Sequence, residues 1–245
     1  MKVLVMGSTG GSGRAAVAHL LAQGHEVTAF TRQARSFQRA DRLRVLCGDA
    51  MNASHVESAI AGHQAVVVAL GISENPLRVR LFGPAHTPID VRSVGTRHVI
   101  TAMRKHGLRR LVVQTSFGIG PTRGRLALAD RMFFELILKP QIADTEEQER
   151  AVRESDRDWV IVQPVHLTDA AEASPPFVSS AGETGAMKVS RTSVGRVLAE
   201  AVTNPACVRQ SLAVSGPVGQ SGRRPAPAHL AASSHAGIGQ PCPNR

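Results

Sequence analysis

Short apolar segments recur along the chain, and most neighbouring pairs leave room for a helix between them. Each segment is about the length of a strand and rich in β-branched residues, and they cover 2–7, 26–32, 43–49, 65–71, 110–116, 159–164 and 211–216. Their side chains are apolar almost without alternation, which is typical of strands covered on both faces. This pattern predicts a parallel β-sheet enclosed by helices.

Residues that start and stop helices lie between these strands. Gly24 and Gly107 each follow a helical segment and are predicted as C′ glycines, while Ser54 and Glu57 predict a capping box. Because strands and helices alternate, the chain is expected to form right-handed βαβ units. The predicted fold class is α/β, a doubly wound Rossmann fold with a mostly parallel central sheet flanked by helices on both faces.

The second half of the chain is less regular. An apolar helix is predicted over 126–139, a charged helix over 144–156 with acidic residues in its first turn, and a helix over 191–204 with Thr192 as N-cap. With 42% hydrophobic residues, the chain can bury one sizeable core. We therefore expect one domain over 1–216. Residues 217–245 have no periodicity and no acidic residue, and they are expected to form a disordered, dispensable tail.

Charge and composition narrow the classes of function. The formal net charge is +10, which fits an anionic cofactor as well as a nucleic acid, but only 3% of residues are aromatic and stacking platforms are scarce. Cys47, Cys207 and Cys242 lack the spacing of a metal site or a disulfide framework and are expected to be ordinary thiols. We expect no metal, no nucleic acid and no membrane partner, and a cytoplasmic protein, because no targeting segment is seen.

Glycines 7, 10 and 13 form a G-x-x-G-x-x-G pattern between the first strand and the first helix. In that position glycine allows a tight turn, lets the backbone approach a pyrophosphate and leaves the N–H groups of the helix N-terminus free for the phosphates. The pattern predicts a dinucleotide site. The alternative is a glycine-rich connector that binds nothing.

The end of the second strand distinguishes the two nicotinamide cofactors. A site for NAD normally carries an acidic residue there, whereas this chain has Thr31, Arg32 and Arg35 and no acid between Glu26 and Asp41. Cations at this place favour the 2′-phosphate of NADP, and NADPH over NADH. The alternative for Arg32 is a solvated loop residue. Asp49, after the third strand, is predicted either to accept a hydrogen bond from adenine or to form an Asx turn.

With these features the chain resembles the atypical short-chain dehydrogenases/reductases of the NAD(P)-binding, NmrA-like kind, including the flavin reductase/biliverdin-IXβ reductase group. The segments that carry the resemblance are 7–14, 24–32, 48–52, 94–116, 151–169 and 188–202. The resemblance implies cofactor-binding roles in five groups of residues. They are Gly7, Ser8, Thr9, Gly10, Gly11, Ser12 and Gly13 at the pyrophosphate, Arg32 at the 2′-phosphate, Asp49 and Ala50 at the adenine, Leu70 and Gly71 along the ribose, and Thr115, Pro164 and Val165 at the nicotinamide.

The resemblance also implies an unusual proton chemistry. Most short-chain dehydrogenases use a Tyr-x-x-x-Lys pair, but this sequence contains no tyrosine. Hydride transfer to a flavin, a quinone or a linear tetrapyrrole is compatible with the absence of tyrosine, because such acceptors take a proton from water or a weak donor. Ser116 and His166 are the candidate catalytic residues that orient the acceptor. The alternative for Ser116 is a serine that only terminates the strand or contacts the carboxamide, and the alternative for His166 is a satisfied loop residue.

The segment 71–90 is predicted to border the substrate, with Arg78, Arg80 and His86 as candidates to meet an acidic group. The leading hypothesis is an NADPH-dependent oxidoreductase of a small-molecule acceptor that is conjugated, acting as a monomer or small homo-oligomer. The alternative is a non-catalytic regulatory protein that senses NADP(H). The apolar residues 126–138 are expected to wall the substrate pocket or fill the core, with a partner surface as the alternative.

Overall fold

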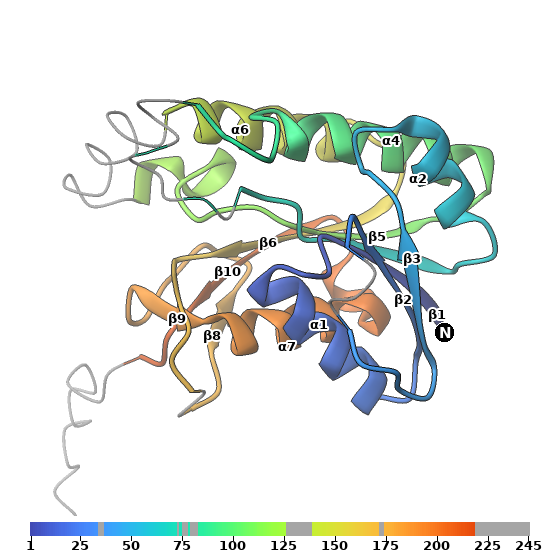
Figure 1. Cartoon of the computed structure of the whole chain (residues 1–245). Helices are drawn as coiled ribbons and strands as arrows, with labels where there is room; N and C mark the ends of the chain where they lie inside the picture. Colours follow the sequence, from blue (N-terminus) through green and yellow to red (C-terminus); the bar gives the residue numbers. More distant parts are fainter. Residues whose placement is uncertain are drawn as a thin grey trace, which may run out of the picture.

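The computed structural model describes residues 1–33, 37–72, 74, 78, 83–125, 139–171 and 174–218. Within them a single large sheet has the strand order β3-β2-β1-β4-β5-β6-β10-β8 (Figure 1). Its strands are β1 (Lys2–Met6), β2 (Glu26–Thr31), β3 (Leu43–Cys47), β4 (Ala65–Val68), β5 (Arg110–Gln114), β6 (Asp158–Pro164), β8 (Phe177–Ser179) and β10 (Gln210–Ser215). All neighbours are parallel except β8, which pairs antiparallel with β10. The predicted fold class is confirmed.

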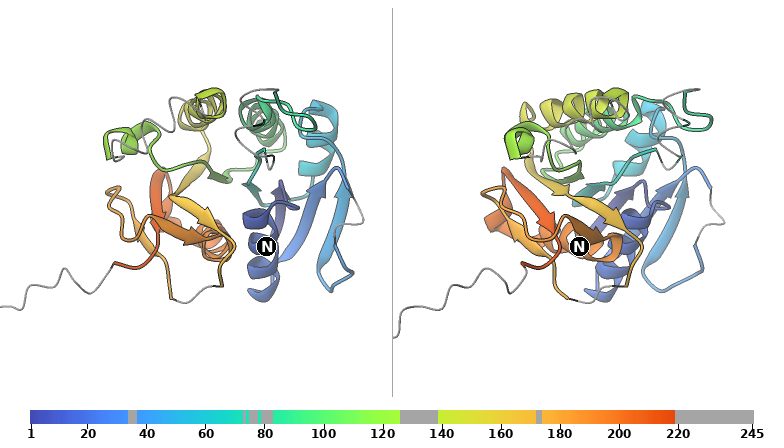
Figure 2. Two further views of the ribbon diagram at one scale, coloured as in Figure 1. Left: turned by 60° about the vertical axis from the view of Figure 1, so that its left-hand side comes forward. Right: turned by 90° about the vertical axis from the view of Figure 1, so that its left-hand side faces the viewer.

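Helices cover the sheet on both faces (Figures 1 and 2). α1 (Gly11–Ala22) and α7 (Arg191–Thr203) lie on one face, and α2 (Ala53–Ile60), α4 (Val91–Lys105) and α6 (Lys139–Arg153) on the other. Two short 3₁₀ helices, η2 (Gly120–Arg125) and η4 (Pro205–Cys207), and a parallel pair of strands, β7 (His166–Thr168) and β9 (Lys188–Ser190), complete the described elements.

The alternating side chains of β1 divide the core into two layers. Val3 and Val5 pack toward α1 and α7, while Leu4 and Met6 pack toward α2, α4 and α6, and all four are fully buried. A strand buried on both faces must be apolar at every position, which is why its sequence lacks the period of two seen in half-exposed strands.

Several predicted helix ends are confirmed and others are wrong. Gly24 and Gly107 have φ of +80° and +69° just after α1 and α4, as expected of C′ glycines. The capping box of Ser54 and Glu57 does not form, because α2 is capped by Asn52, whose side chain accepts from the N–H groups of Ser54 and His55. Asn is as good a cap as Ser, and it lies one residue before the helix.

The N-cap of α7 is Ser190 and not Thr192, since the Ser190 hydroxyl accepts from the Ser193 N–H at 3.0 Å. The charged helix is also longer than predicted. α6 begins at Lys139, so its acidic residues lie in its middle and not in its first turn. There they make ion pairs with neighbouring helices and within α6, and no stabilisation by the helix dipole is expected.

Short strands were not predicted. β7, β8 and β9 have three residues each, too few to show a period. Outside the described residues lie 126–138 of the apolar helix predicted over 126–139, Arg35, Arg80 and residues 219–245 of the predicted tail. The division into a domain over 1–216 and a tail therefore stays a prediction. None of the described helices is long and apolar enough to cross a membrane.

Candidate functional site

A cavity of about 290 Å³ opens at the carboxyl ends of β1, β2, β3 and β4. In a doubly wound sheet this edge is where ligands bind. The structure brings together nine of the predicted cofactor residues in its wall: Gly7, Thr9, Gly10, Gly11, Arg32, Asp49, Ala50, Leu70 and Gly71. The other lining residues are Phe30, Thr31, Gly48, Ala69, Thr87, Pro88 and Val91.

Two glycines of the loop are required by close backbone approaches. Gly7 has φ of +73°, and a Cβ on it would overlap the carbonyl oxygen of Ala69 at the end of β4. A Cβ on Gly13 would overlap the carbonyl oxygen of Gly7, so α1 can begin directly against the turn only because residue 13 is glycine. The loop is therefore shaped by its packing against β4, and it leaves its outer side to the cavity.

The N-terminus of α1 faces this cavity without a side-chain cap. Gly10 is the N-cap, and no side chain in the described part of the molecule accepts from the first-turn N–H groups there. A 12-residue helix whose first N–H groups are unpaired has a positive end suited to phosphate. The residues present fit a pyrophosphate.

Ser8 and Ser12, both predicted at the pyrophosphate, are buried and do not line the cavity. The Ser8 hydroxyl donates to the carbonyl oxygen of Phe30 at 2.9 Å, which ties the glycine loop to β2. In this arrangement Ser8 supports the loop from behind.

Arg191 packs on the glycine loop although it does not line the cavity, and the sequence did not reveal this contact. It is the first residue of α7, and its side chain packs so closely on Gly11 that a Cβ there would overlap its Cδ. Its Nη1 also donates to the Asp169 carboxylate at 2.7 Å. The Arg191 guanidinium thus lies beside the glycine loop although the two are about 180 residues apart in the sequence. No sequence motif links positions so far apart.

Arg32 lies at the end of β2, where it lines the cavity as predicted. Its Nη1 donates to the carbonyl oxygen of His86 at 2.8 Å and its Nη2 to the Thr87 hydroxyl at 3.0 Å. Glu74 holds the same loop by accepting from the N–H groups of Ala85 and His86, and these two hydrogen bonds lower the pKa of Glu74. Both acceptors of Arg32 are neutral, so its charge is not balanced by a bonded carboxylate.

Asp49 forms the Asx turn that was one of its two predicted roles. Its Oδ1 accepts from the Met51 N–H at 3.0 Å. The carboxylate also lines the cavity next to Ala50, at the end of β3 where an adenine would lie.

The residues predicted at the nicotinamide lie at the ends of β5 and β6, outside the wall of this cavity. Thr115 is buried, and its hydroxyl donates to Glu149 Oε1 at 2.7 Å. Ser116 is partly exposed and its hydroxyl donates to the carbonyl oxygen of Phe117 at 3.3 Å, a long bond. The backbone N–H groups of Thr115 and Phe117 donate to the carbonyl oxygens of Val162 and Pro164, which aligns the two strand ends.

Val165 is buried behind the end of β6, and His166 is exposed at the start of β7. The structure places Pro164 beside the end of β5, where its carbonyl oxygen accepts from the Phe117 N–H, while the Val165 N–H donates to Val214 of β10. His166 lies in a short strand paired with Lys188.

A buried polar network lies beneath these strand ends. Besides Thr115, Glu149 Oε1 accepts from Gln163 Nε2 at 2.8 Å, and Glu149 Oε2 accepts from Arg153 Nη2 at 2.9 Å. Glu149 and Gln163 have 2% and 0% of their surface exposed, so these bonds replace nearly all their water contacts. The network fixes the ends of β5 and β6 against α6.

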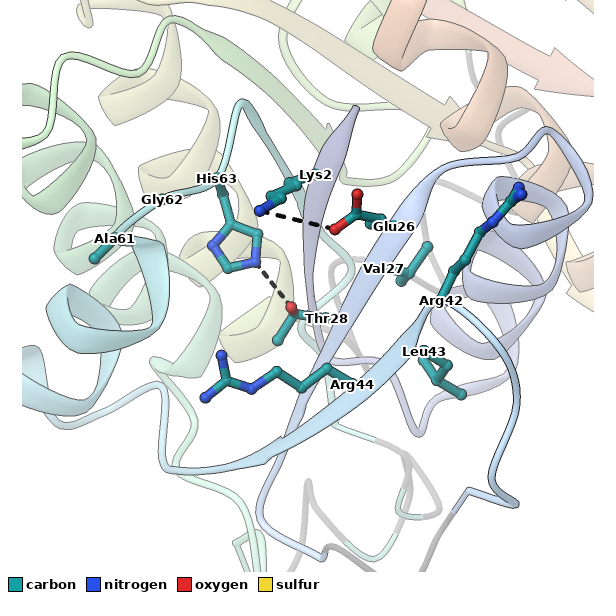
Figure 3. A pocket seen from close by; sticks show the side chains of 10 residues that line it. All are labelled: Lys2, Glu26, Val27, Thr28, Arg42, Leu43, Arg44, Ala61, Gly62 and His63. Atoms are coloured by element: carbon teal, nitrogen blue, oxygen red, sulfur yellow. Dashed lines mark hydrogen bonds and ion pairs between the residues drawn. The ribbon is translucent and has the colours of Figure 1, made fainter.

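A second cavity, of about 350 Å³, lies at the opposite, amino edge of β1, β2 and β3 (Figure 3). His63 leans into it, with Nδ1 donating to the carbonyl oxygen of Ile60 and Nε2 accepting from the Thr28 hydroxyl at 2.8 Å. Burial lowers the pKa of His63, and Arg44 and Lys2 lower it further. None of the predicted site residues lines this cavity.

Comparison with known proteins agrees with the carboxyl-edge site. Residues 7–205 match the family model described as NAD(P)H-binding. The chain belongs to this NAD(P)H-binding family. The match begins at the first glycine of the loop and extends past α7, so it includes every described residue that lines the cavity. No curated protein matches the chain.

Solved structures share the fold of this family member at low sequence identity. A short-chain dehydrogenase/reductase from Veillonella parvula, solved in complex with NADP, has a TM-score of 0.72 at 17% identity, covering 88% of this chain and 94% of its own. The anaerobillin reductase ChuY from Escherichia coli has a TM-score of 0.70 at 24% identity, covering 92% of this chain and 100% of its own. An oxidoreductase from Lactococcus lactis has a TM-score of 0.71 at 15% identity, covering 89% and 92%. The NAD(P)H-binding family implied by the sequence is confirmed, and the solved structures show the shared fold.

Proposed function

We propose that the protein is an NADPH-dependent oxidoreductase that transfers hydride to a small conjugated acceptor such as a flavin or a quinone. The observation that carries this proposal is the cavity at the carboxyl edge, where a glycine loop and the uncapped N-terminus of α1 face the same space. Membership of the NAD(P)H-binding family and the likeness to reductases support it.

Arg32 supports NADPH over NADH. Arg32 lines the cavity, and among the described residues its guanidinium donates only to a carbonyl and a hydroxyl oxygen of the 86–87 loop. A 2′-phosphate carries negative charge and accepts stronger hydrogen bonds than these neutral groups, so exchanging them for the phosphate is favourable. A 2′-hydroxyl offers no such gain.

In the proposed reaction, residues of this chain would bind the cofactor and orient the acceptor. The nicotinamide, when bound, supplies the hydride. The glycine loop, the N-terminus of α1 and Arg191 would hold the pyrophosphate, with Asp49 and Ala50 at the adenine and Leu70 and Gly71 along the ribose. Thr115, Pro164 and Val165 would position the nicotinamide from the aligned ends of β5 and β6. Ser116 would orient the acceptor, because its long, weak hydrogen bond to Phe117 can be replaced at little cost in free energy by one to the acceptor. His166 is the second candidate for that role.

The test mixes purified protein with NADPH or NADH and a panel of flavins and quinones, and follows the absorbance of the reduced nicotinamide. We expect turnover with NADPH. Ser116→Ala should lower kcat with little change in NADPH affinity, whereas the exposed Ser54→Ala should change neither. An unchanged kcat in Ser116→Ala would remove Ser116 from the site, and no binding of either dinucleotide would refute the whole proposal.

A non-catalytic sensor of NADP(H) is the second candidate. It is favoured by the absence of tyrosine and by the commitment of the Thr115 hydroxyl to Glu149, which leave few proton donors at the strand ends. Tight NADPH binding without turnover on any acceptor would support the sensor and contradict the enzyme.

A further inference from the structure

Arg92, the second residue of α4, places its guanidinium against the carboxyl end of β4. A Cβ on Gly71 would lie 3.1 Å from Arg92 Nη2 and 3.6 Å from Cζ, so the planar group rests directly on this glycine. Gly71 also lines the cofactor cavity, as does Val91, the neighbour of Arg92. The guanidinium therefore lies just beyond the wall of the site.

This guanidinium lacks the partners that a buried charge needs. Its Nη1 is completely buried and has no hydrogen-bond partner, and its side chain donates no hydrogen bond within the part of the chain that the structure describes. The nearest acid, Asp144, uses its two carboxylate oxygens on the backbone N–H groups of Arg92 and Ser93, at 3.1 and 3.0 Å. Burial lowers the pKa of Arg92, and the attraction of Asp144 opposes this shift only in part.

Two other arginines of the described residues donate side-chain hydrogen bonds, which Arg92 does not. The buried Arg157 donates to Asp156 and to the carbonyl oxygen of Leu108. Arg110 also has a buried Nη1 without a partner, but its Nε and Nη2 donate to the carbonyl oxygens of Val202 and Asn204. Burying a charged group without hydrogen bonds costs free energy, so the Arg92 guanidinium does not stabilise the fold. Its position beside the cavity is explained if a ligand supplies the missing hydrogen-bond acceptor.

We propose that Arg92 binds an oxyanion, a carboxylate or a phosphate, of a ligand that reaches Gly71 in addition to the ribose of the cofactor. This rests on the proposed function and deepens it. The glycine loop, α1 and Arg191 already provide for the pyrophosphate, and Arg32 for a 2′-phosphate. The oxyanion at Arg92 therefore belongs to the acceptor, which makes the acceptor an acidic, conjugated molecule.

The first test uses the stability of the protein without ligand. Arg92→Met removes the charge and keeps most of the volume, so its unfolding midpoint in urea should equal or exceed that of the parent protein. If Arg92 instead served the fold, Arg92→Met would unfold at lower urea or fail to fold, and the proposal would be overturned. Arg97→Met is the matched control, because Arg97 is an exposed arginine of the same helix that pairs with Glu147.

The second test measures binding by titration calorimetry with benzoate as an aryl carboxylate and benzamide as its neutral counterpart, with and without saturating NADP⁺. Benzoate should bind the parent protein better than benzamide does. Arg92→Met should weaken benzoate at least about tenfold, the loss expected for one charge-assisted hydrogen bond, and leave benzamide unchanged. Arg92→Lys should recover part of the benzoate affinity, because a lysine keeps the charge without the planar fork. Arg97→Met should bind benzoate as the parent does.

Titration with NADP⁺ distinguishes an oxyanion of the cofactor from one of the acceptor. If Arg92→Met weakens NADP⁺ and not benzoate, the oxyanion is a phosphate of the cofactor, and the acidic acceptor is refuted. If benzoate and NADP⁺ both bind Arg92→Met as tightly as the parent, Arg92 binds no oxyanion. A parent protein that binds benzoate through Arg92 but no dinucleotide would refute the proposed function and leave the role of Arg92 standing.

Discussion

Replacing Arg32 with alanine should remove the proposed preference for NADPH, so that the variant scarcely distinguishes NADPH from NADH. In the structure the guanidinium makes two hydrogen bonds to neutral acceptors, at 2.8 and 3.0 Å, which a 2′-phosphate would displace. Two charge-assisted bonds contribute about 3–5 kcal/mol and the two bonds given up about 2 kcal/mol, a net of about 1–3 kcal/mol. NADPH affinity should therefore fall roughly 5- to 150-fold, nearer the lower figure because Arg32 is exposed.

The assay is a fluorescence or calorimetric titration of NADPH and NADH against both proteins. NADH affinity should stay within about twofold, because its 2′-hydroxyl replaces neutral acceptors with another neutral acceptor. Arg39→Ala is the matched control, since Arg39 is exposed on the same connection and does not line the cavity. Equal losses for NADPH and NADH, or an equal effect of Arg39→Ala, would refute the reasoning.

Three further predictions concern the scaffold. Gly195→Ala should destabilise the protein by about 2 kcal/mol in urea unfolding, because its Cβ would overlap α1 at Ala15, whereas Gly124→Ala, with open space around it, should not. Glu149→Gln should cost about 2 kcal/mol in the same assay, because its amide N–H₂ cannot accept from every donor that now faces the carboxylate. Burial lowers the pKa of His63 in the folded protein. Its neutral imidazole therefore stabilises the fold above pH about 6.5, and this stabilisation is lost as the pH falls through the folded-state pKa. In His63→Gln the thermal midpoint should accordingly depend less on pH between pH 7.5 and 5.

Each of these predictions has a clear contrary result. If Gly195→Ala and Gly124→Ala unfold at the same urea concentration, α1 and α7 have room to separate. If Glu149→Gln is as stable as the parent, the buried network does not need the charge. If the parent and His63→Gln lose thermal stability equally on acidification, other groups cause the loss.

The strands that are buried on both faces could be predicted because their burial demands an unbroken apolar run. β1 and β6 satisfy that demand, and their positions follow from the sequence within a residue or two. β8 could not be predicted, because it is a three-residue edge strand in which Val178 is 40% exposed. β8 is a strand only because it pairs with β10, and the local sequence does not predict that pairing.

Helix caps show a similar limit. Asn52 and Ser54 are both good caps, and only the backbone geometry around α2 decides between them. At the site, the glycine loop was predictable because it is a local turn with steric requirements. Arg92 and Arg191 were not, because an arginine becomes part of a site only when distant segments, at Gly71 and Gly11, come to lie against it.

The packing of Arg191 on Gly11 has a consequence for the order in which the protein is made. The glycine loop leaves the ribosome before the helix that covers it, which follows about 180 residues later. Until α7 has been synthesised, Ala16, Val17 and Leu20 of α1 have no partner helix to cover them. The glycine loop thus reaches its binding-competent form only after α7 has been made, and a nascent chain that ends before α7 should not yet hold a dinucleotide.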